Sequence, residues 1–108
     1  MHFDHVAQQV PDIAAAVDHY LEAVPGTTVI YQDETWAFLD AAGAKLAFVM
    51  ADQHPNHLAW RVDDAELERM AAEHGAEIAT HRDRTRSFYI AGPGGMATEV
   101  IAYPADAE

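Results

Sequence analysis

The sequence predicts an α+β protein, with residues 1–108 forming a single domain built from two βαβββ modules. Residues 57–64 (HLAWRVDD) repeat residues 5–12 (HVAQQVPD), and the shared His, Ala, Val and Asp each lie 52 positions apart. A helical pattern follows each copy, and three strand patterns follow each helix, as expected for a duplicated supersecondary unit. The chain has 108 residues, 50% of them hydrophobic, which is enough for one core.

The first module, residues 1–53, has sequence signals for one helix and four strands. Asp12 is a good N-cap, and apolar residues recur at helical spacing until Pro25-Gly26 ends the helix. β-Branched and aromatic residues mark the strands. The expected elements are a strand at 3–10, a helix at 13–24, and strands at 27–32, 36–40 and 45–50.

The second module, residues 54–108, repeats that order after a polar linker at 51–56. Asp63 or Asp64 caps the helix, Gly75 ends it, and Gly92-Pro93-Gly94-Gly95 is a strong turn signal. The expected elements are a strand at 57–62, a helix at 65–74, strands at 76–80, 86–91 and 96–103, a charged loop at 81–85, and a tail at 104–108.

Composition excludes several classes of partner. The net charge of −12 opposes binding to phosphate backbones and anionic membranes, so we expect no nucleic acid partner. We also expect no membrane partner, since no apolar run reaches membrane length and no secretory leader is evident at Met1. The absence of cysteine leaves His and carboxylates as the strong metal ligands and fits a cytoplasmic location.

A buried carboxylate and two repeated histidines are the candidate metal ligands. The 52-residue offset aligns residues 97–101 with residues 45–49, so Glu99 occupies the position of Ala47 inside an apolar strand. A carboxylate there is costly unless it is paired or binds a metal. With His5 and His57 it would make a 2-His-1-carboxylate site for a divalent metal ion: Fe, Mn, Ni, Co or Zn.

The chain resembles the vicinal oxygen chelate superfamily, which includes glyoxalase I, extradiol dioxygenases, methylmalonyl-CoA epimerase and bleomycin-binding proteins. The resemblance is carried by the two HxAxxVxD motifs (5–12 and 57–64) and by SFYIxxPxGxxxE (87–99). It implies a glyoxalase/dioxygenase-like fold, in which two βαβββ modules form a curved mixed-sheet cup around a divalent metal. It also implies metal ligation by His5, His57 and Glu99 and a small-molecule substrate with two neighbouring oxygens.

The chain departs from the superfamily pattern at two positions. Glyoxalase-like and epimerase-like members usually place a fourth ligand, Glu or Gln, where this chain has Ala47. The pattern therefore looks more like the three-ligand members, the extradiol dioxygenases and fosfomycin transferases. Ser87 and Tyr89 fall where fosfomycin-type proteins place anion-contacting hydroxyls, although the accompanying lysine is not evident. Gly92 stands where Asp usually precedes the proline, so the turn there is expected to differ.

Several other residues are candidates for contact with a substrate. Tyr89, Ser87, Arg86, Trp60 and Phe48 are the predicted substrate-binding residues, although aromatics in strands are more often core residues. His81 is an alternative acid or base, if it is not merely solvated. Half of the Lys and Arg residues cluster at 82, 84 and 86. This cluster is either an anion contact or a solvated loop paired with Asp83.

We predict a metal-dependent enzyme with dioxygenase-like or glyoxalase-like lyase or isomerase chemistry, in which Glu99 is the catalytic residue. Without a base at position 47, isomerase action would have to use Glu99, His81 or Tyr89. The alternative function is a non-catalytic, bleomycin-resistance-like protein that sequesters a small molecule. The resemblance and the apolar helix faces also favour a homodimer.

Overall fold

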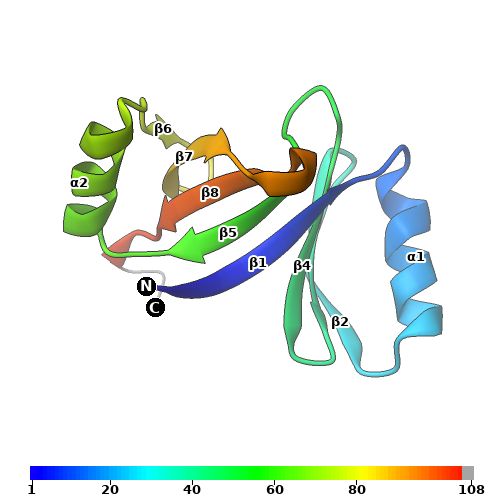
Figure 1. Cartoon of the computed structure of the whole chain (residues 1–108). Helices are drawn as coiled ribbons and strands as arrows, with labels where there is room; N and C mark the ends of the chain where they lie inside the picture. The colour runs from blue at the N-terminus through cyan, green and yellow to red at the C-terminus, as the bar shows by residue number, and fades with distance from the viewer. Residues whose placement is uncertain (106–108) are drawn as a thin grey trace. The chain divides into compact units, whose positions relative to one another are not determined.

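The structure is a computed structural model that describes residues 1–105, and its chain divides into two compact units. The N-terminal unit is His5–His57, and the C-terminal unit comprises Met1–Asp4 together with the described residues from Leu58 onward. Figure 1 follows the chain through both. Residues 106–108 of the predicted tail lie outside the described residues, and the single domain of residues 1–108 stays a prediction.

The N-terminal unit contains a mixed sheet with the strand order β2-β3-β4-β1. β1 runs parallel to β4, whereas β2, β3 and β4 form an antiparallel meander. The first three residues of β1 belong to the C-terminal unit, and the rest of the strand belongs here. The strands are β1 (His2–Gln9), β2 (Thr27–Gln32), β3 (Trp36–Ala41) and β4 (Ala44–Val49).

Helix α1 (Ile13–Ala23) covers one face of this sheet, as Figure 1 shows. Asp12 caps the helix as predicted, because its carboxylate accepts a hydrogen bond of 3.0 Å from the amide of Ala15. Ile13 and Val17 are buried against the sheet. The buried core residues beneath the helix are Ile13, Val17, Ala37, Leu39, Leu46 and Phe48.

The C-terminal unit repeats this architecture with the strand order β5-β8-β7-β6. β8 pairs antiparallel with β7, and β7 pairs antiparallel with β6. Asp63, one of the two predicted caps, accepts a 2.8 Å hydrogen bond from the amide of Glu66, and Gly75 ends the helix in the left-handed conformation. The elements are β5 (His57–Arg61), α2 (Asp64–His74), β6 (Ala79–Thr80), β7 (Arg86–Ala91), a 3₁₀ turn (Pro93–Gly95) and β8 (Ala97–Ala102).

The α+β class and the two βαβββ modules are therefore confirmed, with one element much shorter than predicted. The expected strand at 76–80 is wrong for residues 76–78, and only Ala79–Thr80 pairs with β7. The amide of Ala76 bonds to the carbonyl of Ala71 at the end of α2, and Ala76 and Ile78 pack against the core beneath that helix. Residues 76–78 therefore cap α2 and pack in the core beneath it instead of pairing with β7.

The repeat seen in the sequence reappears in the backbone hydrogen bonds. The amide of Val10 donates to the carbonyl of Val49, and the amide of Val62 donates to that of Ile101, both at 2.9 Å. These two bonds join equivalent residues of the two modules. In the first module, the register also pairs Ala7 of β1 with Ala47 of β4.

The turn before β8 requires glycine at its first residue. A Cβ on Gly92 would lie 2.2 Å from the carbonyl oxygen of Met96, which no side chain tolerates without a backbone shift. This close approach gives a physical reason for glycine at position 92. Among the described residues, neither helix is long and apolar enough to cross a membrane.

Replacing Leu67 by alanine should destabilise the protein strongly, because this α2 side chain is completely buried. We expect a loss of about 2–5 kcal/mol in the free energy of unfolding, measured by denaturant titration. The matched control is Leu21→Ala in α1, where the side chain is 47% exposed and the loss should be much smaller. Equal losses in the two variants would contradict the assigned core.

Candidate functional site

The N-terminal unit brings two predicted metal ligands close together. His5 on β1 and His57 at the start of β5 have their Nε2 atoms 3.3 Å apart. The ring centroids lie 5.4 Å apart with an interplanar angle of 74°, so the rings do not stack. The exposed fractions of the two residues are 8% and 3%, so both imidazoles have largely left water.

The polar linker fixes the orientation of the second imidazole. Nδ1 of His57 lies 2.7 Å from the carbonyl oxygen of Pro55. Because a carbonyl can only accept, Nδ1 must carry the proton and donate this bond. Neutral His57 is then the tautomer with its lone pair on Nε2, the nitrogen that faces His5. A backbone carbonyl that holds the far nitrogen in this way is a common second partner of metal-binding histidines.

The spacing of the two imidazole nitrogens fits a shared metal ion. Zinc–imidazole bonds are about 2.0–2.1 Å long. Two such bonds to one ion separate the two nitrogens by roughly 2.8–3.0 Å at octahedral angles and roughly 3.3–3.4 Å at tetrahedral angles. The observed 3.3 Å lies within the tetrahedral range. The pair therefore has the donor type and separation that a transition metal requires.

Small and aromatic residues surround the histidine pair on the face of the sheet opposite α1. Phe38 approaches His5 edge-on, with centroids 5.6 Å apart and planes at 88°. It also packs on Ala7, Ala47 and Val49. The sequence motifs pointed to Phe48 and not to Phe38. Strand alternation could have found Phe38, because it pairs with Ala47. Ala47 itself offers no ligand atom.

The C-terminal unit holds the predicted carboxylate, Glu99, at the third residue of β8. Its exposed fraction is 3%, and Val100 and Ile101 follow it as core residues. Tyr89 pairs with it directly across β7 and β8, and its hydroxyl donates a hydrogen bond to the carboxylate. Burial, and then the charge of Glu99, raise the pKa of Tyr89 well above its usual range. Tyr89 is therefore held as a protonated donor.

His81 lies beside the same carboxylate, at the start of the loop after β6. Its Nε2 is 2.7 Å from Oγ of Ser87, which is almost completely buried, and 3.9 Å from Oε2 of Glu99. The predicted residues Ser87 and Tyr89 thus lie near Glu99, and His81 joins them. The arrangement gathers one carboxylate, two hydroxyls and one imidazole in the C-terminal unit.

Phe48, Trp60 and Arg86 have other packing partners. Phe48 lies in the core beneath α1, on the sheet face opposite Ala47. Trp60 alternates with Ala59 along β5 and packs edge-on against Phe3, with centroids 5.3 Å apart. Arg86 bonds Asp64 at 3.1 Å and also Glu68, both on α2. Substrate contact by these three residues stays a prediction, and this packing does not favour it.

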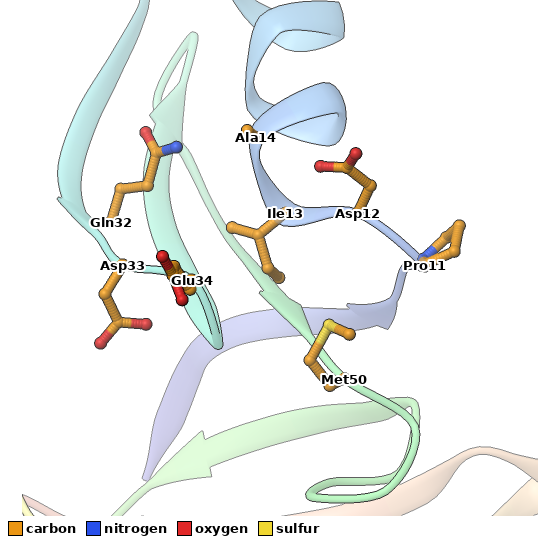
Figure 2. Close-up of a pocket in the computed structure, with 8 residues that line it drawn as sticks. All are labelled: Pro11, Asp12, Ile13, Ala14, Gln32, Asp33, Glu34 and Met50. Atoms are coloured by element: carbon orange, nitrogen blue, oxygen red, sulfur yellow. The ribbon is translucent and has the colours of Figure 1, made fainter.

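An open hollow of about 490 Å³ lies elsewhere in the N-terminal unit, at the start of α1. Figure 2 shows Asp12 and Ile13 on one side of it and the turn from β2 to β3 on the other. Asp33 in that turn accepts bonds from Tyr31, Thr35 and Trp36, with Tyr31 contributing most to a pKa well below its usual range. None of the predicted site residues lines this hollow.

Solved structures identify the fold. No protein-family model and no curated protein matches the chain. Methylmalonyl-CoA epimerase from Mycobacterium tuberculosis aligns over 97% of this chain and 89% of its own, with a TM-score of 0.73 and 19% identity. The Mn(II)-bound glyoxalase from Novosphingobium aromaticivorans aligns over 94% of this chain and 38% of its own, with a TM-score of 0.60 and 19% identity.

A third similar structure is a variant of homoprotocatechuate 2,3-dioxygenase from B. fuscum. It aligns over 95% of this chain and 32% of its own, with a TM-score of 0.67 and 18% identity. The chain therefore has the vicinal oxygen chelate fold, as the sequence motifs indicated. Identities this low establish the fold and leave the activity to be argued from the residues.

The Pro55 contact predicts the tautomer of His57 in solution. Long-range ¹H–¹⁵N correlation spectra of the metal-free protein should show neutral His57 protonated on Nδ1, because Nδ1 donates to the Pro55 carbonyl. His19 on α1 serves as the comparison, since no such carbonyl contact is seen for it among the described residues. A spectrum with His57 protonated on Nε2 alone would contradict the proposed orientation.

Proposed function

We propose that the chain is a metal-dependent enzyme of the vicinal oxygen chelate type, acting on a small substrate with two neighbouring oxygens. His5, His57 and Glu99 supply donors that could hold a metal ion. The observation that carries the proposal is the imidazole pair, with nitrogens 3.3 Å apart and His57 in the ligand tautomer. In the metal-free protein the same two nitrogens are joined by a hydrogen bond, which a metal ion would replace.

The repeat supports Glu99 as the third ligand. In the first module, Ala7 pairs with Ala47 on the face that also carries His5. The equivalent residues of the second module are Ala59 and Glu99, and the matched backbone bond from Val62 to Ile101 supports the same register there. This equivalence predicts Glu99 beside Ala59, on the face of β5 that carries His57.

The donor set suits a transition metal. Two imidazoles and one carboxylate favour Fe, Mn, Ni, Co or Zn over Mg or Ca. One of the structurally similar proteins is a Mn(II)-bound glyoxalase, and another is a 2,3-dioxygenase. When bound, such an ion would supply Lewis acidity toward the neighbouring oxygens of the substrate. Which of these ions binds is the first quantity to measure.

The neighbours of Glu99 have distinct roles in this proposal. Tyr89 orients the carboxylate through its hydroxyl, which stays protonated. His81 is the group placed to accept or donate a proton near Glu99, and its bond to Ser87 holds the ring in place. Ala47 can move no proton, so the first module offers no partner for isomerase chemistry. We therefore favour dioxygenase-like chemistry over lyase or isomerase chemistry.

Metal binding should depend on each of the three ligands. Purified untagged protein should contain about one divalent ion per chain by elemental analysis. Loss of a residue that only hydrogen-bonds a ligand typically weakens metal binding by ~10–100-fold. His57→Ala and Glu99→Ala should each weaken binding by more than this, because each removes a direct ligand.

The control for metal binding is His74→Ala, which removes an imidazole from the end of α2. Affinity for the ion should remain unchanged in that variant. Retention of a stoichiometric ion in both His57→Ala and Glu99→Ala would overturn the metal assignment.

A turnover assay distinguishes the proposed enzyme from a protein that only binds and sequesters a small molecule. The Fe(II)-loaded protein should consume oxygen when catechols are added, whereas a sequestering protein would bind a compound and return it unchanged. The same preparation is then incubated with 2-oxo aldehydes to test lyase chemistry. Absence of turnover with both substrate classes, together with full metal loading, would contradict the proposed enzymatic function.

We also propose a cytoplasmic homodimer. The chain has no cysteine, as suits a reducing compartment. β2 comes first in the strand order of the N-terminal unit, and it exposes Val29, Ile30 and Tyr31 by 39%, 52% and 41%. An apolar strand of this kind is a natural surface for a second copy.

Light scattering should therefore give twice the monomer mass of 11.8 kDa, and Ile30→Lys should shift the protein toward monomer. A monomer at micromolar concentration would contradict the homodimer.

A further inference from the structure

We propose that Gln9 and Asn56 are positioning residues of the metal site. They fix the linker of residues 51–56 to the end of β1, and this attachment holds the carbonyl of Pro55 against His57. The inference rests on the proposed function for the role of His57 as a metal ligand. It goes beyond that function by naming the contacts, outside the ligand set, that orient this imidazole.

Gln9 holds the linker on both sides of Pro55. Its side-chain amide donates a hydrogen bond of 2.9 Å to the carbonyl of His54, the residue before the proline. Its backbone amide donates a bond of 2.6 Å to Oδ1 of Asn56, the residue after the proline. The bonded residues lie 45 and 47 positions apart in the chain, so these are tertiary contacts that attach the linker to the strand.

The direction of the Pro55 carbonyl depends on its neighbours in the chain. Proline has no backbone N–H with which to fix its own position. Its carbonyl oxygen accepts the 2.7 Å bond from Nδ1 of His57. The two residues that Gln9 binds, His54 and Asn56, flank the proline and therefore set where that oxygen points.

β1 gives these contacts a firm support. The amide of Val10 donates to the carbonyl of Val49 at 2.9 Å, which continues the parallel pairing of β1 with β4. Alternate residues of a strand bond a given neighbour, so the amide of Gln9 points away from β4, where Asn56 accepts its hydrogen bond. The same strand carries His5. One strand therefore bears the first imidazole and holds the linker that orients the second.

The first half of the linker is a turn of its own. The carbonyl of Met50 accepts bonds from the amides of Gln53 and His54, at 3.0 Å and 3.1 Å. That turn orders residues 50–54, and the two bonds from Gln9 extend the order to residue 56. Loss of these bonds would release the acceptor of Nδ1 in His57, and the tautomer with its lone pair on Nε2 would no longer be selected.

The first experiment follows the tautomer of His57 in the metal-free protein, so its result is independent of metal binding. Long-range ¹H–¹⁵N spectra are recorded well above the usual imidazole pKa of about 6.5. Gln9→Met keeps the length of the side chain but cannot donate to the linker, and a signal of the Nε2-protonated tautomer should appear. Gln8→Met changes the neighbouring, exposed glutamine and should keep the wild-type spectrum.

Asn56 provides a second variant and a conservative rescue. Asn56→Ala removes the acceptor of the Gln9 amide and should also populate the Nε2-protonated tautomer of His57. Asn56→Asp keeps an acceptor oxygen at this position and should restore the wild-type signal. A residue that only stabilised the fold would not change the tautomer of one imidazole selectively.

The second experiment measures Zn(II) affinity by titration. Gln9→Met and Asn56→Ala should each weaken binding by about tenfold, the lower end of the range for residues that act on a ligand from outside the ligand set. Gln8→Met should bind Zn(II) as the wild type does.

The outcomes separate this inference from the proposed function. A wild-type His57 tautomer in both Gln9→Met and Asn56→Ala, or unchanged Zn(II) affinity in both, would overturn the inference and leave the metal function standing. A tautomer change that appears equally in Gln8→Met or in Asn56→Asp would also overturn it. Tautomer changes as predicted, in a protein that binds no Zn(II), would support the positioning contacts and count against the metal function.

Discussion

The rest of the proposed site depends on one hydrogen bond, from Nδ1 of His57 to the carbonyl of Pro55. Without it, the imidazole could rotate or present a protonated nitrogen to His5, and the two Nε2 atoms would not form a ligand pair 3.3 Å apart. The linker before β5 is therefore part of the site. Proline at position 55 also favours extended backbone at the preceding residue, which suits a segment leading into a strand.

The second constraint is the cost of burying a carboxylate. Glu99 is 3% exposed in a strand whose next residues are core residues, so its charge must be compensated locally. The hydroxyl of Tyr89 provides part of this compensation and orients the carboxylate, and Nε2 of His81 lies 3.9 Å from it. Such partners would keep the acid in place before a metal ion arrives. The need to stabilise this carboxylate also explains why Tyr89 of β7 and His81 of the preceding loop both lie beside Glu99.

Most of the fold could be predicted from the sequence, because the repeat and the caps are local signals. Helices begin at the caps Asp12 and Asp63, and α2 ends at Gly75, in each case through contacts only a few residues away. The segment 76–78 could not be predicted, since packing against α2 outweighed its strand propensity. His5, His57 and Glu99 came from the repeat and the cost of burial. Phe38 and the Pro55 carbonyl were missed, because they depend on register and on a loop conformation that the sequence does not encode locally.

The central claim is that two imidazoles and one carboxylate bind a single ion. X-ray absorption spectroscopy of the Zn(II)-loaded protein tests it most directly, because imidazole rings give a characteristic multiple-scattering signal. The spectrum should show two imidazole nitrogens at about 2.0–2.1 Å together with oxygen ligands at about 2.0–2.2 Å. A spectrum with one imidazole or none, or with oxygen ligands alone, would contradict it.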